Sequence, residues 1–395
     1  MKYDFENLHP AYGTNLPMWD RLSKFAPLSS DEIDFGVAEM KFHIASEISS
    51  ALTEYIKNGT FGYSGPPADF SDSICNWMSN NHSWKISPDW ITQTYGLEQA
   101  IGFAITALSK ESDGVLVCFP TYYPFVRTVS GRKRKLVRSD LILKNGRYEF
   151  DFEDIESKII SENVRVFILC SPHNPVGRVW EKSELNKIGS ICKRHGVYVV
   201  SDEIHSDICF GSNEYTVFSE AGEGFREFSA ILTAPSKTFN IAGLTVSNTI
   251  IANDNIRSRF REVVTSELGQ YTNAIGYAAC TAAYNNGSAW LNECLKVLEY
   301  NCNYFRNFVN INIPDFHVNV QEGTYLVWLD CRKTGITGDS LEDFLHNKAK
   351  FYTQRGDSFG EGFEGFHRVN LACPTEYVIK AAQRLKAAYN ESCCI

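Results

Sequence analysis

Lys237 is the residue whose surroundings most suggest chemistry. The segments 229–233 and 245–252 both have the apolar composition of buried strands, and Lys237 lies in the short link between them. Its neighbours Ser236 and Thr238 are small and polar. A lysine that is removed from water can lose its proton and attack a carbonyl carbon. This position could therefore form a Schiff base with a carbonyl compound.

Three other polar residues lie at a similar place, just beyond the end of a predicted strand. In an open α/β sheet the ligand crevice lies outside the carboxyl ends of the strands. We therefore expect these side chains to converge with Lys237 on one pocket. They are Tyr122 after strand 114–119, Asn174 after strand 164–170, and Asp202 after strand 197–200.

The chemistry of this set fits the ring of pyridoxal phosphate. Lys237 would form the Schiff base, and Asp202 would pair with the protonated pyridine nitrogen, which keeps the ring an electron sink. Asn174 could donate a hydrogen bond to the phenolic oxygen of the ring. Tyr122 could stack on the ring face. Together these residues predict a site for pyridoxal phosphate.

A phosphate site is predicted separately, at Gly96, Leu97 and Glu98. This turn opens a helix that carries Ile101, Ala104, Ile105 and Leu108. The first backbone N–H groups of a helix have no partner within the helix, so they can bind a phosphate. The Ser236 hydroxyl could add a further donor.

Each of these residues also has an ordinary structural interpretation. Asn174 with Pro175 is a common turn former, and Asp202 with Glu203 could be surface charge. Tyr122 could belong to the core, and His205 is more often a structural histidine than an acid or base. The cofactor interpretation depends on all of them meeting at one edge of a sheet.

The order of predicted elements places the chain in the α/β class. Strands and helices alternate up to about residue 252, and the strands are nearly continuous apolar runs. Such runs predict a mostly parallel sheet covered by helices on both faces. After about residue 285 the alternation ends, which indicates a smaller α+β domain. The predicted division is a large domain over 41–285 and a small domain over 286–395, with segment 1–40 packed against the small domain.

Composition limits the partners that we expect. The 395 residues are 44% hydrophobic and 22% charged, with a net charge of -9, so nucleic-acid binding has little support. The longest apolar runs are too short to span a bilayer, and the N-terminus lacks the apolar core of a signal peptide. Twelve cysteines without a C-x-x-C pair favour a reduced, cytoplasmic protein, and no metal-ligand spacing occurs.

Several segments together resemble a known family. The chain is similar to the fold-type I, class I/II aminotransferase superfamily of pyridoxal phosphate enzymes, and more closely to its branch of cystathionine β-lyases, or C–S β-lyases. The resemblance extends over nearly the whole chain. The segments that carry it are 61–63, 170–180, 201–207, 236–244, 323–330 and 368–374.

The resemblance implies further roles. Arg368 would hold the α-carboxylate of an amino-acid substrate, as a bidentate arginine does well, and Ala38 would line the substrate site. Tyr63 would reach the cofactor phosphate of a neighbouring subunit, so the active unit would be a homodimer with shared active sites. His205 takes the place of a tyrosine that many aminotransferases direct at the ring oxygen. Thr245 stands where aminotransferases carry a phosphate-binding arginine, which the lyase branch also lacks.

The N-terminal part differs from the branch pattern near the expected substrate entrance. The branch usually reads Trp-Val-Ala-Asp-Met-Asp, whereas residues 36–41 of this chain read Gly-Val-Ala-Glu-Met-Lys. The leading hypothesis is a C–S β-lyase that cleaves cystathionine or a related cysteine S-conjugate, with Lys237 as the catalytic base. An aminotransferase, which would use the same residues for its first steps, is the alternative. A degenerate homologue that only binds ligands is a third possibility, which the intact set of polar residues disfavours.

Overall fold

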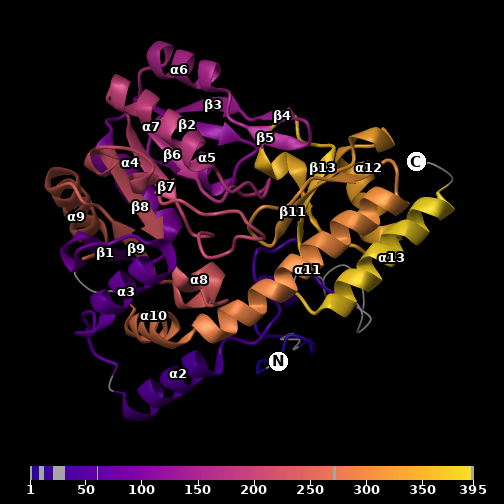
Figure 1. The fold of residues 1–395 in the computed structure, drawn as a ribbon, viewed down its shortest axis with the longest axis horizontal. Coiled ribbons are helices and arrows are strands. Elements are labelled where there is room, and N and C mark those ends of the chain that lie inside the picture. Colours follow the sequence, from indigo (N-terminus) through magenta and orange to yellow (C-terminus); the bar gives the residue numbers. More distant parts are fainter. Residues whose placement is uncertain (1, 9–12, 21–31, 60, 270–272, 393–395) are drawn as a thin grey trace.

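A seven-stranded sheet forms the centre of the larger part of the molecule (Figure 1). The computed structural model describes residues 2–8, 13–20, 32–59, 61–269 and 273–392. Neighbouring strands are parallel except in the two pairs made by β9, which is antiparallel to both of its neighbours. In spatial order the strands are β1 (Ile91–Thr94), β9 (Ser247–Ile250), β8 (Ser229–Thr233), β7 (Tyr198–Asp202), β6 (Val164–Cys170), β2 (Gly114–Phe119) and β3 (Lys135–Asp140).

Helices connect these strands and cover the sheet. A small separate hairpin, β4 (Ile142–Lys144) and β5 (Arg147–Glu149), turns at Asn145-Gly146, and both turn residues have positive φ. Asn-Gly favours this kind of tight turn. The helices are α2 (Ser46–Asn58), α3 (Phe70–His82), α4 (Leu97–Leu108), α5 (Pro124–Gly131), α6 (Phe152–Ser161), α7 (Lys182–His195), α8 (Pro235–Thr238), α9 (Asp254–Leu268) and α10 (Ala274–Asn286).

The strands are apolar on both faces because each face is buried. Along β2, Val115 and Val117 pack into one core with residues of α4 and α9. The alternate residues Leu116 and Cys118 pack into the other core with residues of α6 and α7. Successive side chains of a strand point to opposite faces. A strand covered on both sides therefore has a continuous apolar run, as the sequence shows.

The C-terminal part contains a second, four-stranded antiparallel sheet. The long helix α11 runs diagonally across the molecule in Figure 1, with α13 beside it. The strand order is β10 (His317–Val318), β11 (Leu326–Asp330), β13 (Phe366–Asn370) and β12 (Gln354–Arg355), and the helices are α11 (Ser288–Asn312), α12 (Gly338–Asp343), which continues as a π-helical turn at Phe344–Lys348, and α13 (Thr375–Glu391).

The N-terminal segment contacts this second sheet. Phe35 N–H donates to the carbonyl of Tyr352 at 2.7 Å, and Asn370 N–H of β13 donates to the carbonyl of Phe35 at 2.7 Å. We propose the division into segment 1–40, a large domain over 41–285 and a small domain over 286–395. These contacts and the two separate sheets support it.

Most predicted elements occur close to their expected positions, with a few differences. The expected strand over 245–252 is shorter, because Thr245 has a left-handed backbone (φ 44°) and β9 spans only Ser247–Ile250. Residues 17–20 form the short helix α1 (Pro17–Asp20), which was not predicted from the sequence. Besides α1, the helices α3, α5, α6, α8, α9 and α10 were not predicted from the sequence. Buried apolar residues do recur at helical spacing in α9, at Ile256, Phe260 and Val264, so the pattern was present there and was missed.

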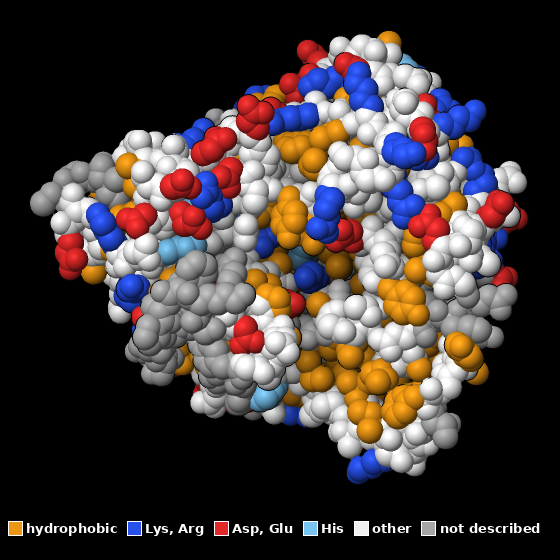
Figure 2. All heavy atoms as spheres, turned by 180° about the vertical axis from the view of Figure 1, so that it is seen from behind, with side chains coloured by type: hydrophobic (Ala, Val, Ile, Leu, Met, Phe, Trp, Pro, Cys, Tyr) orange, Lys and Arg blue, Asp and Glu red, His pale blue; other side chains and the backbone are white. Residues whose placement is uncertain are grey.

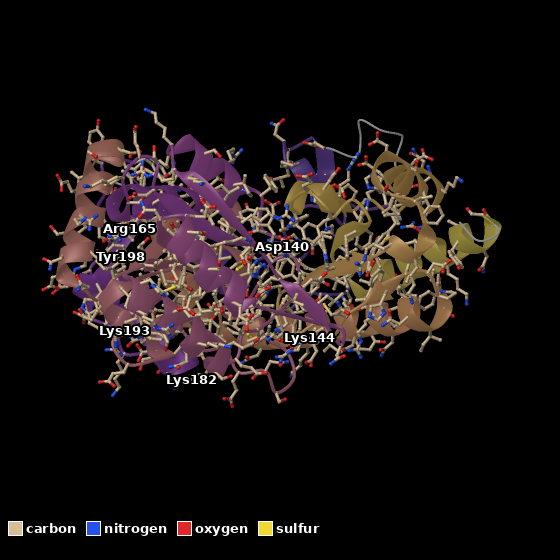
Figure 3. All side chains as sticks on the ribbon, turned by 90° about the horizontal axis from the view of Figure 1, so that it is seen from above. Asp140, Lys144, Arg165, Lys182, Lys193 and Tyr198 are labelled. Atoms are coloured by element: carbon tan, nitrogen blue, oxygen red, sulfur yellow. The ribbon has the colours of Figure 1, made fainter. Side chains whose placement is uncertain are left out.

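Charged side chains lie on the outer faces of the covering helices. Figure 3 labels Lys182 and Lys193 of α7 at the periphery, whereas Leu185 and Ile188 of the same helix are buried. This is the amphipathic pattern of a helix packed on a sheet. Among the described helices, none is both long enough and apolar enough to cross a membrane.

Candidate active site

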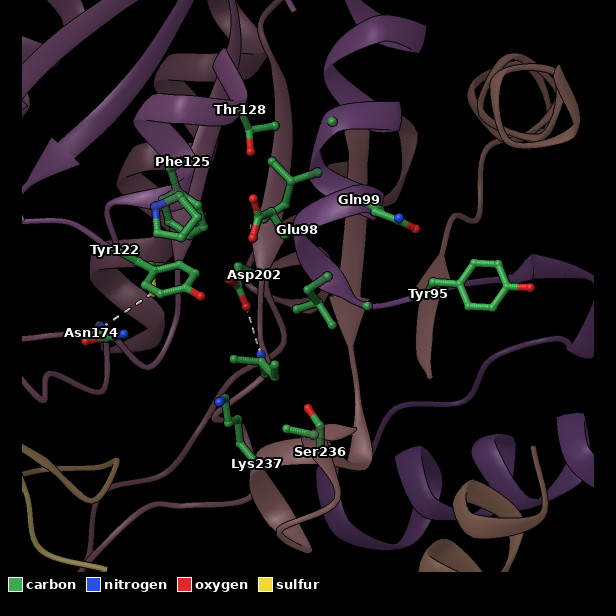
Figure 4. Close-up of a pocket in the computed structure, with 18 of the residues that line it drawn as sticks. Tyr95, Glu98, Gln99, Tyr122, Phe125, Thr128, Asn174, Asp202, Ser236 and Lys237 are labelled. Carbon is green, nitrogen blue, oxygen red and sulfur yellow. Dashed lines mark hydrogen bonds between the residues drawn. The ribbon is translucent and has the colours of Figure 1, made fainter. Parts of the chain in front are cut away.

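Most of the predicted site residues line one cavity at the carboxyl ends of the central strands. Its volume is about 720 Å³, and Figure 4 shows the side chains that point into it. Two of the predicted residues, Tyr63 and Arg368, are not part of its lining. Those that line it are Ala38, Gly96, Leu97, Glu98, Tyr122, Asn174, Asp202, His205, Ser236 and Lys237.

Lys237 lies on α8, the short helix that follows β8. Pro235 occupies the first turn of this helix, where a missing N–H is tolerated. The Lys237 ammonium donates to the carbonyl of Ala38 at 2.7 Å. The residue keeps some exposure toward the cavity. Burial of the amine lowers its pKa, Glu39 opposes this shift, and the nearby Arg368 adds to it. A larger fraction of this amine is therefore neutral and nucleophilic than for a surface lysine.

Asp202 is the last residue of β7. The sequence analysis had placed it just beyond the end of the strand. It pairs in register with Cys170, the last residue of β6. One carboxylate oxygen accepts the N–H of Ile204 at 3.1 Å. Burial raises the pKa of Asp202 to about 7, although that hydrogen bond and Lys237 favour the charged form. A cationic partner in the cavity would restore the charged carboxylate.

Asn174 occupies a loop that buried contacts hold in place. The backbone N–H of Asn174 points at the sulfur of Cys170 (3.5 Å; Figure 4), and its side-chain oxygen accepts from Arg368 at 3.3 Å. The side-chain N–H groups of Asn174 thus remain for a ligand in the cavity. Farther along the loop, Arg178 forms a buried ion pair with Glu322 at 2.8 Å.

Tyr122 and His205 border the same space. Tyr122 is half-buried and its ring packs edge-on against Phe125, with 5.6 Å between centroids. His205 is 3% exposed, and its Nδ1 atom has no hydrogen-bond partner among the described residues. Burial, with help from Lys237 and Arg368, lowers the pKa of His205 to about 3, so its imidazole is neutral. A buried polar atom without a partner is unfavourable, which indicates that a ligand atom normally lies beside it.

The first turn of α4 faces the cavity. Gly96 precedes it with φ 110° and ψ 160°, a conformation that favours glycine. Ser236 and Thr245 also line the cavity. The Glu98 carboxylate is paired with Arg127, which reduces its repulsion of an anion. Backbone N–H groups and hydroxyls here can hold a phosphate without an arginine at position 245.

Arg368 lies next to the cavity on β13. Its guanidinium donates to the side-chain oxygen of Asn174 and, at 2.7 Å, to the carbonyl of Gly36. Its Nε atom is buried without a partner, and no carboxylate within the described ranges forms an ion pair with it. Burial lowers the pKa of Arg368 to about 10, so it remains charged at neutral pH. This cation is suited to a carboxylate that arrives with a ligand.

Tyr63 lies apart from the other predicted residues. It is 93% exposed and belongs to the irregular segment after α2. The structure therefore does not bring Tyr63 to the cavity of its own chain.

Two asparagines that the sequence analysis did not single out hold segment 37–42 against the site. Asn370 donates to the carbonyls of Val37 (2.5 Å) and Glu39 (2.7 Å). Asn240 donates to the carbonyls of Met40 (3.0 Å) and Phe42 (2.9 Å). Asn240 lies in segment 236–244 and Asn370 in segment 368–374, and both segments carry the family resemblance, which was the available signal.

A buried network beneath α8 was missed as well. Asp207 accepts hydrogen bonds from the Thr238 hydroxyl (2.6 Å) and the Trp77 indole (3.0 Å), and it pairs with His82 at 2.8 Å. The hydrogen bond with His82 lowers the pKa of Asp207, against the effect of burial. Because Thr238 is adjacent to Lys237, this network fixes the helix that carries the lysine. Trp77 and His82 lie more than 120 residues earlier in the chain, so spacing could not reveal them.

Comparison with known proteins agrees with this geometry. The model of the family "Aminotransferase class I and II" matches residues 30–385. The chain belongs to this family. It is 36% identical over 385 residues to the cystathionine beta-lyase PatB of Bacillus subtilis, covering 98% of this chain and 99% of that one. It is 30% identical to the protein MalY of Escherichia coli, covering 97% and 98%.

A solved structure shows the same fold. Cystalysin from Treponema denticola, described as containing a pyridoxal 5'-phosphate cofactor, superposes with a TM-score of 0.96 at 35% identity, covering 99% of this chain and all of that one. The predicted fold class is therefore confirmed: this member of the class I and II aminotransferase family has the fold of pyridoxal phosphate enzymes of fold type I.

The residues present fit pyridoxal phosphate. The cavity combines an amine with a lowered pKa, a buried carboxylate, a neutral imidazole with an orphaned nitrogen and a helix N-terminus. These groups match the aldehyde, the pyridine nitrogen, the phenolic oxygen and the phosphate of the cofactor, respectively. The roles of the individual residues remain predictions.

The pKa of Asp202 leads to a prediction about stability without cofactor. The folded pKa of about 7 lies above the ordinary value of about 3.9. The stabilising contribution of this carboxyl is complete below about pH 4 and is lost as pH rises through 7, at up to about 1.4 kcal/mol per pH unit. Asp202→Asn should therefore raise the melting temperature of the cofactor-free protein relative to wild type, and by more at pH 8 than at pH 5.

The matched control is Asp339→Asn, whose side chain is 94% exposed and pairs at the surface with Arg355. It should show no such gain at the higher pH, because an exposed carboxylate keeps its water. A pH-independent difference between the Asp202 variant and wild type would show that Asp202 is not held in an unfavourable environment.

Proposed function

We propose that this protein is a pyridoxal phosphate-dependent C–S β-lyase that cleaves cystathionine or a related cysteine S-conjugate. The observation that carries this conclusion is the match with a cystathionine beta-lyase over 98% of the chain, joined to a cavity with the groups such a reaction needs. The products would be a thiol, pyruvate and ammonia. The alternative is an aminotransferase, whose reaction also begins with removal of the Cα proton of an amino acid bound to the cofactor.

The reaction is an α,β-elimination. A proton leaves Cα, the electron pair forms a Cα–Cβ double bond, and the Cβ–S bond breaks so that its pair leaves on sulfur, which takes up a proton. The remaining enamine reacts with water and ends as pyruvate and ammonia. When bound, pyridoxal phosphate supplies an electron-withdrawing ring that stabilises the negative charge developing at Cα.

The residues of the chain would divide this work. Lys237, with its lowered pKa, would take the proton from Cα as general base. Arg368, which lacks a carboxylate partner, would hold the substrate α-carboxylate and so orient Cα toward the lysine. Asp202 would keep the pyridine nitrogen protonated. Asn174 and His205 would face the phenolic oxygen, Tyr122 the ring, and the first turn of α4 with Ser236 the phosphate.

One position favours the lyase over the aminotransferase. Thr245, which lines the cavity, replaces the arginine that aminotransferases direct at the phosphate. The chain thus lacks a cation that is common at this position in aminotransferases. Transamination also leaves the cofactor as an amine, which needs a keto acid for recycling, whereas elimination does not.

The first test of function uses that difference. With L-cystathionine and bound cofactor but no keto acid, the protein should release thiol and pyruvate in equal amounts over many turnovers. Thiol can be followed with a disulfide reagent and pyruvate with lactate dehydrogenase. Lys237→Ala is the control and should release neither. If no thiol is released, while an amino acid is converted to its keto acid over many turnovers only when a second keto acid is supplied, the protein is an aminotransferase instead.

The second test concerns the carboxylate-binding role of Arg368. Arg368→Lys keeps a positive charge but loses the planar fork. A charge-assisted hydrogen bond is worth about 1.5–3 kcal/mol, so KM for amino-acid substrates should rise roughly ten- to a hundredfold. Cofactor content, measured by absorbance, should not change.

Arg332→Lys provides the control, because Arg332 lies on the same domain but pairs at the surface with Asp330. It should leave KM unchanged. An unchanged KM in the Arg368 variant would place the carboxylate-binding group elsewhere.

We also propose a homodimer with shared active sites. The segment at the end of α2 exposes three large apolar side chains, Ile56, Phe61 and Tyr63. In the rear view of Figure 2, hydrophobic side chains gather at the lower right, in the region of α2 and α10. Exposed apolar patches often mark interfaces. Tyr63 would then contribute to the phosphate site of the partner.

Complementation tests this arrangement. Tyr63→Ala and Lys237→Ala should each be poorly active alone. When the two proteins are unfolded and refolded together in equal amounts, random pairing should restore about a quarter of wild-type activity, because half of the dimers contain one intact site out of two. Mixing without subunit exchange serves as the control, and no recovery in refolded mixed dimers would contradict shared sites.

A cytoplasmic location is part of the same proposal. The cysteines of the described residues are free thiols, most of them buried. Free thiols persist in reducing compartments.

A further inference from the structure

Segment 36–44 runs past three parts of the active site in order. The carbonyl of Gly36 accepts from Arg368 at 2.7 Å, and the carbonyl of Ala38 accepts from Lys237 at 2.7 Å. The following residues, starting with Glu39, line a second cavity. A substrate with its carboxylate on Arg368 and its Cα beside Lys237 can therefore extend its side chain along this segment toward Glu39.

The second cavity has a volume of about 330 Å³. Ala242 lines both this cavity and the main one, so the two are neighbours just beyond Lys237. Its walls include the apolar side chains of Leu16, Met40 and Ile44. Such a space can accept the part of a cysteine S-conjugate that lies beyond the sulfur.

Glu39 brings an unpaired negative charge to this place. It is half-buried, and its carboxylate forms no hydrogen bond or ion pair with any residue that the structure describes. Its backbone is held firmly, because its carbonyl accepts from Asn370 at 2.7 Å. Glu39 also has the strongest effect of any nearby charge on Lys237, in agreement with a position beside the amine. An unpaired, half-buried carboxylate at a binding site favours a cationic ligand group.

Lys41 lines the same cavity as Glu39 but does not neutralise its carboxylate. It is 4% exposed, its ammonium lacks a hydrogen-bond partner in the described part of the chain, and it lies 5.9 Å from the ring centroid of Phe35. Burial lowers the pKa of Lys41. No ion pair within 4 Å links it to Glu39.

We propose that Glu39 and the second cavity form a subsite for the leaving thiol, and that it selects thiols carrying an ammonium group about two carbons beyond the sulfur. The inference rests on the proposed lyase reaction, and it specifies that the preferred leaving group is positively charged. Substrates with an uncharged thiol of the same size would be cleaved less well, and those with an anionic thiol least well.

The test compares three substrates in four proteins. S-(2-aminoethyl)-L-cysteine and S-propyl-L-cysteine have the same number of heavy atoms and differ in charge, and S-carboxymethyl-L-cysteine supplies the anionic case. Thiol release gives kcat/KM for each in wild type, Glu39→Gln, Glu39→Asp and the exposed control Glu54→Gln. Leaving-group chemistry is the same in all proteins. The change in the aminoethyl-to-propyl ratio therefore reports the residue at position 39 alone, even if Glu39→Gln changes the rate with every substrate.

We expect Glu39→Gln to lower the aminoethyl-to-propyl ratio about five- to tenfold, as for a partly screened ion pair, and to raise carboxymethyl relative to propyl. Glu39→Asp should keep most of the wild-type ratio, and Glu54→Gln all of it. Thiol release with the same ratios in wild type and Glu39→Gln would overturn this inference and leave the lyase reaction standing. No thiol from any substrate in the wild-type protein would overturn the lyase reaction and the inference with it.

Discussion

The enclosure of the Lys237 amine is the constraint on which the rest of the site depends. A lysine on a four-residue helix would ordinarily reach into water. Here its amine donates to the carbonyl of Ala38, on a segment that Asn240 and Asn370 hold in place. Asn240 belongs to the large domain and Asn370 to the β13 strand of the small sheet. The reactive amine therefore keeps its lowered pKa only when both parts of the chain are assembled.

The site is also unfavourable in the absence of ligands, in a way that explains what it binds. Arg368 is a buried cation without a carboxylate, Asp202 a buried carboxyl with a raised pKa, and His205 a buried imidazole with an orphaned nitrogen. Such groups destabilise a protein by themselves. Each can be satisfied by a particular atom of the cofactor or of an amino acid. The free energy of ligand binding can thus offset the cost of burying these groups, which folding alone leaves without partners.

Two opposite charges lie along segment 36–41 and its contacts. Near Gly36 and Arg368 the site presents a positive charge, and at Glu39 it presents a negative one. These charges suit the two ends of an extended substrate, its α-carboxylate and a cation beyond its sulfur. Residues 36–41, which depart from the branch pattern, are therefore where substrate preference can change without loss of the cofactor site.

The sequence by itself determined the fold class and indicated the residues that we propose to bind the cofactor. Strands buried on both faces must be apolar throughout, and Tyr122, Asn174, Asp202 and Lys237 follow or end such strands, so local pattern was enough to bring them together. Tertiary structure decided what approaches that edge from elsewhere: Arg368 from the second sheet, Ala38 and Glu39 from the N-terminal segment, and Asp207 with His82 beneath α8. The contact of Arg368 with Gly36 joins residues 332 positions apart. No periodicity encodes these contacts, because they depend on how the two sheets and the N-terminal segment pack.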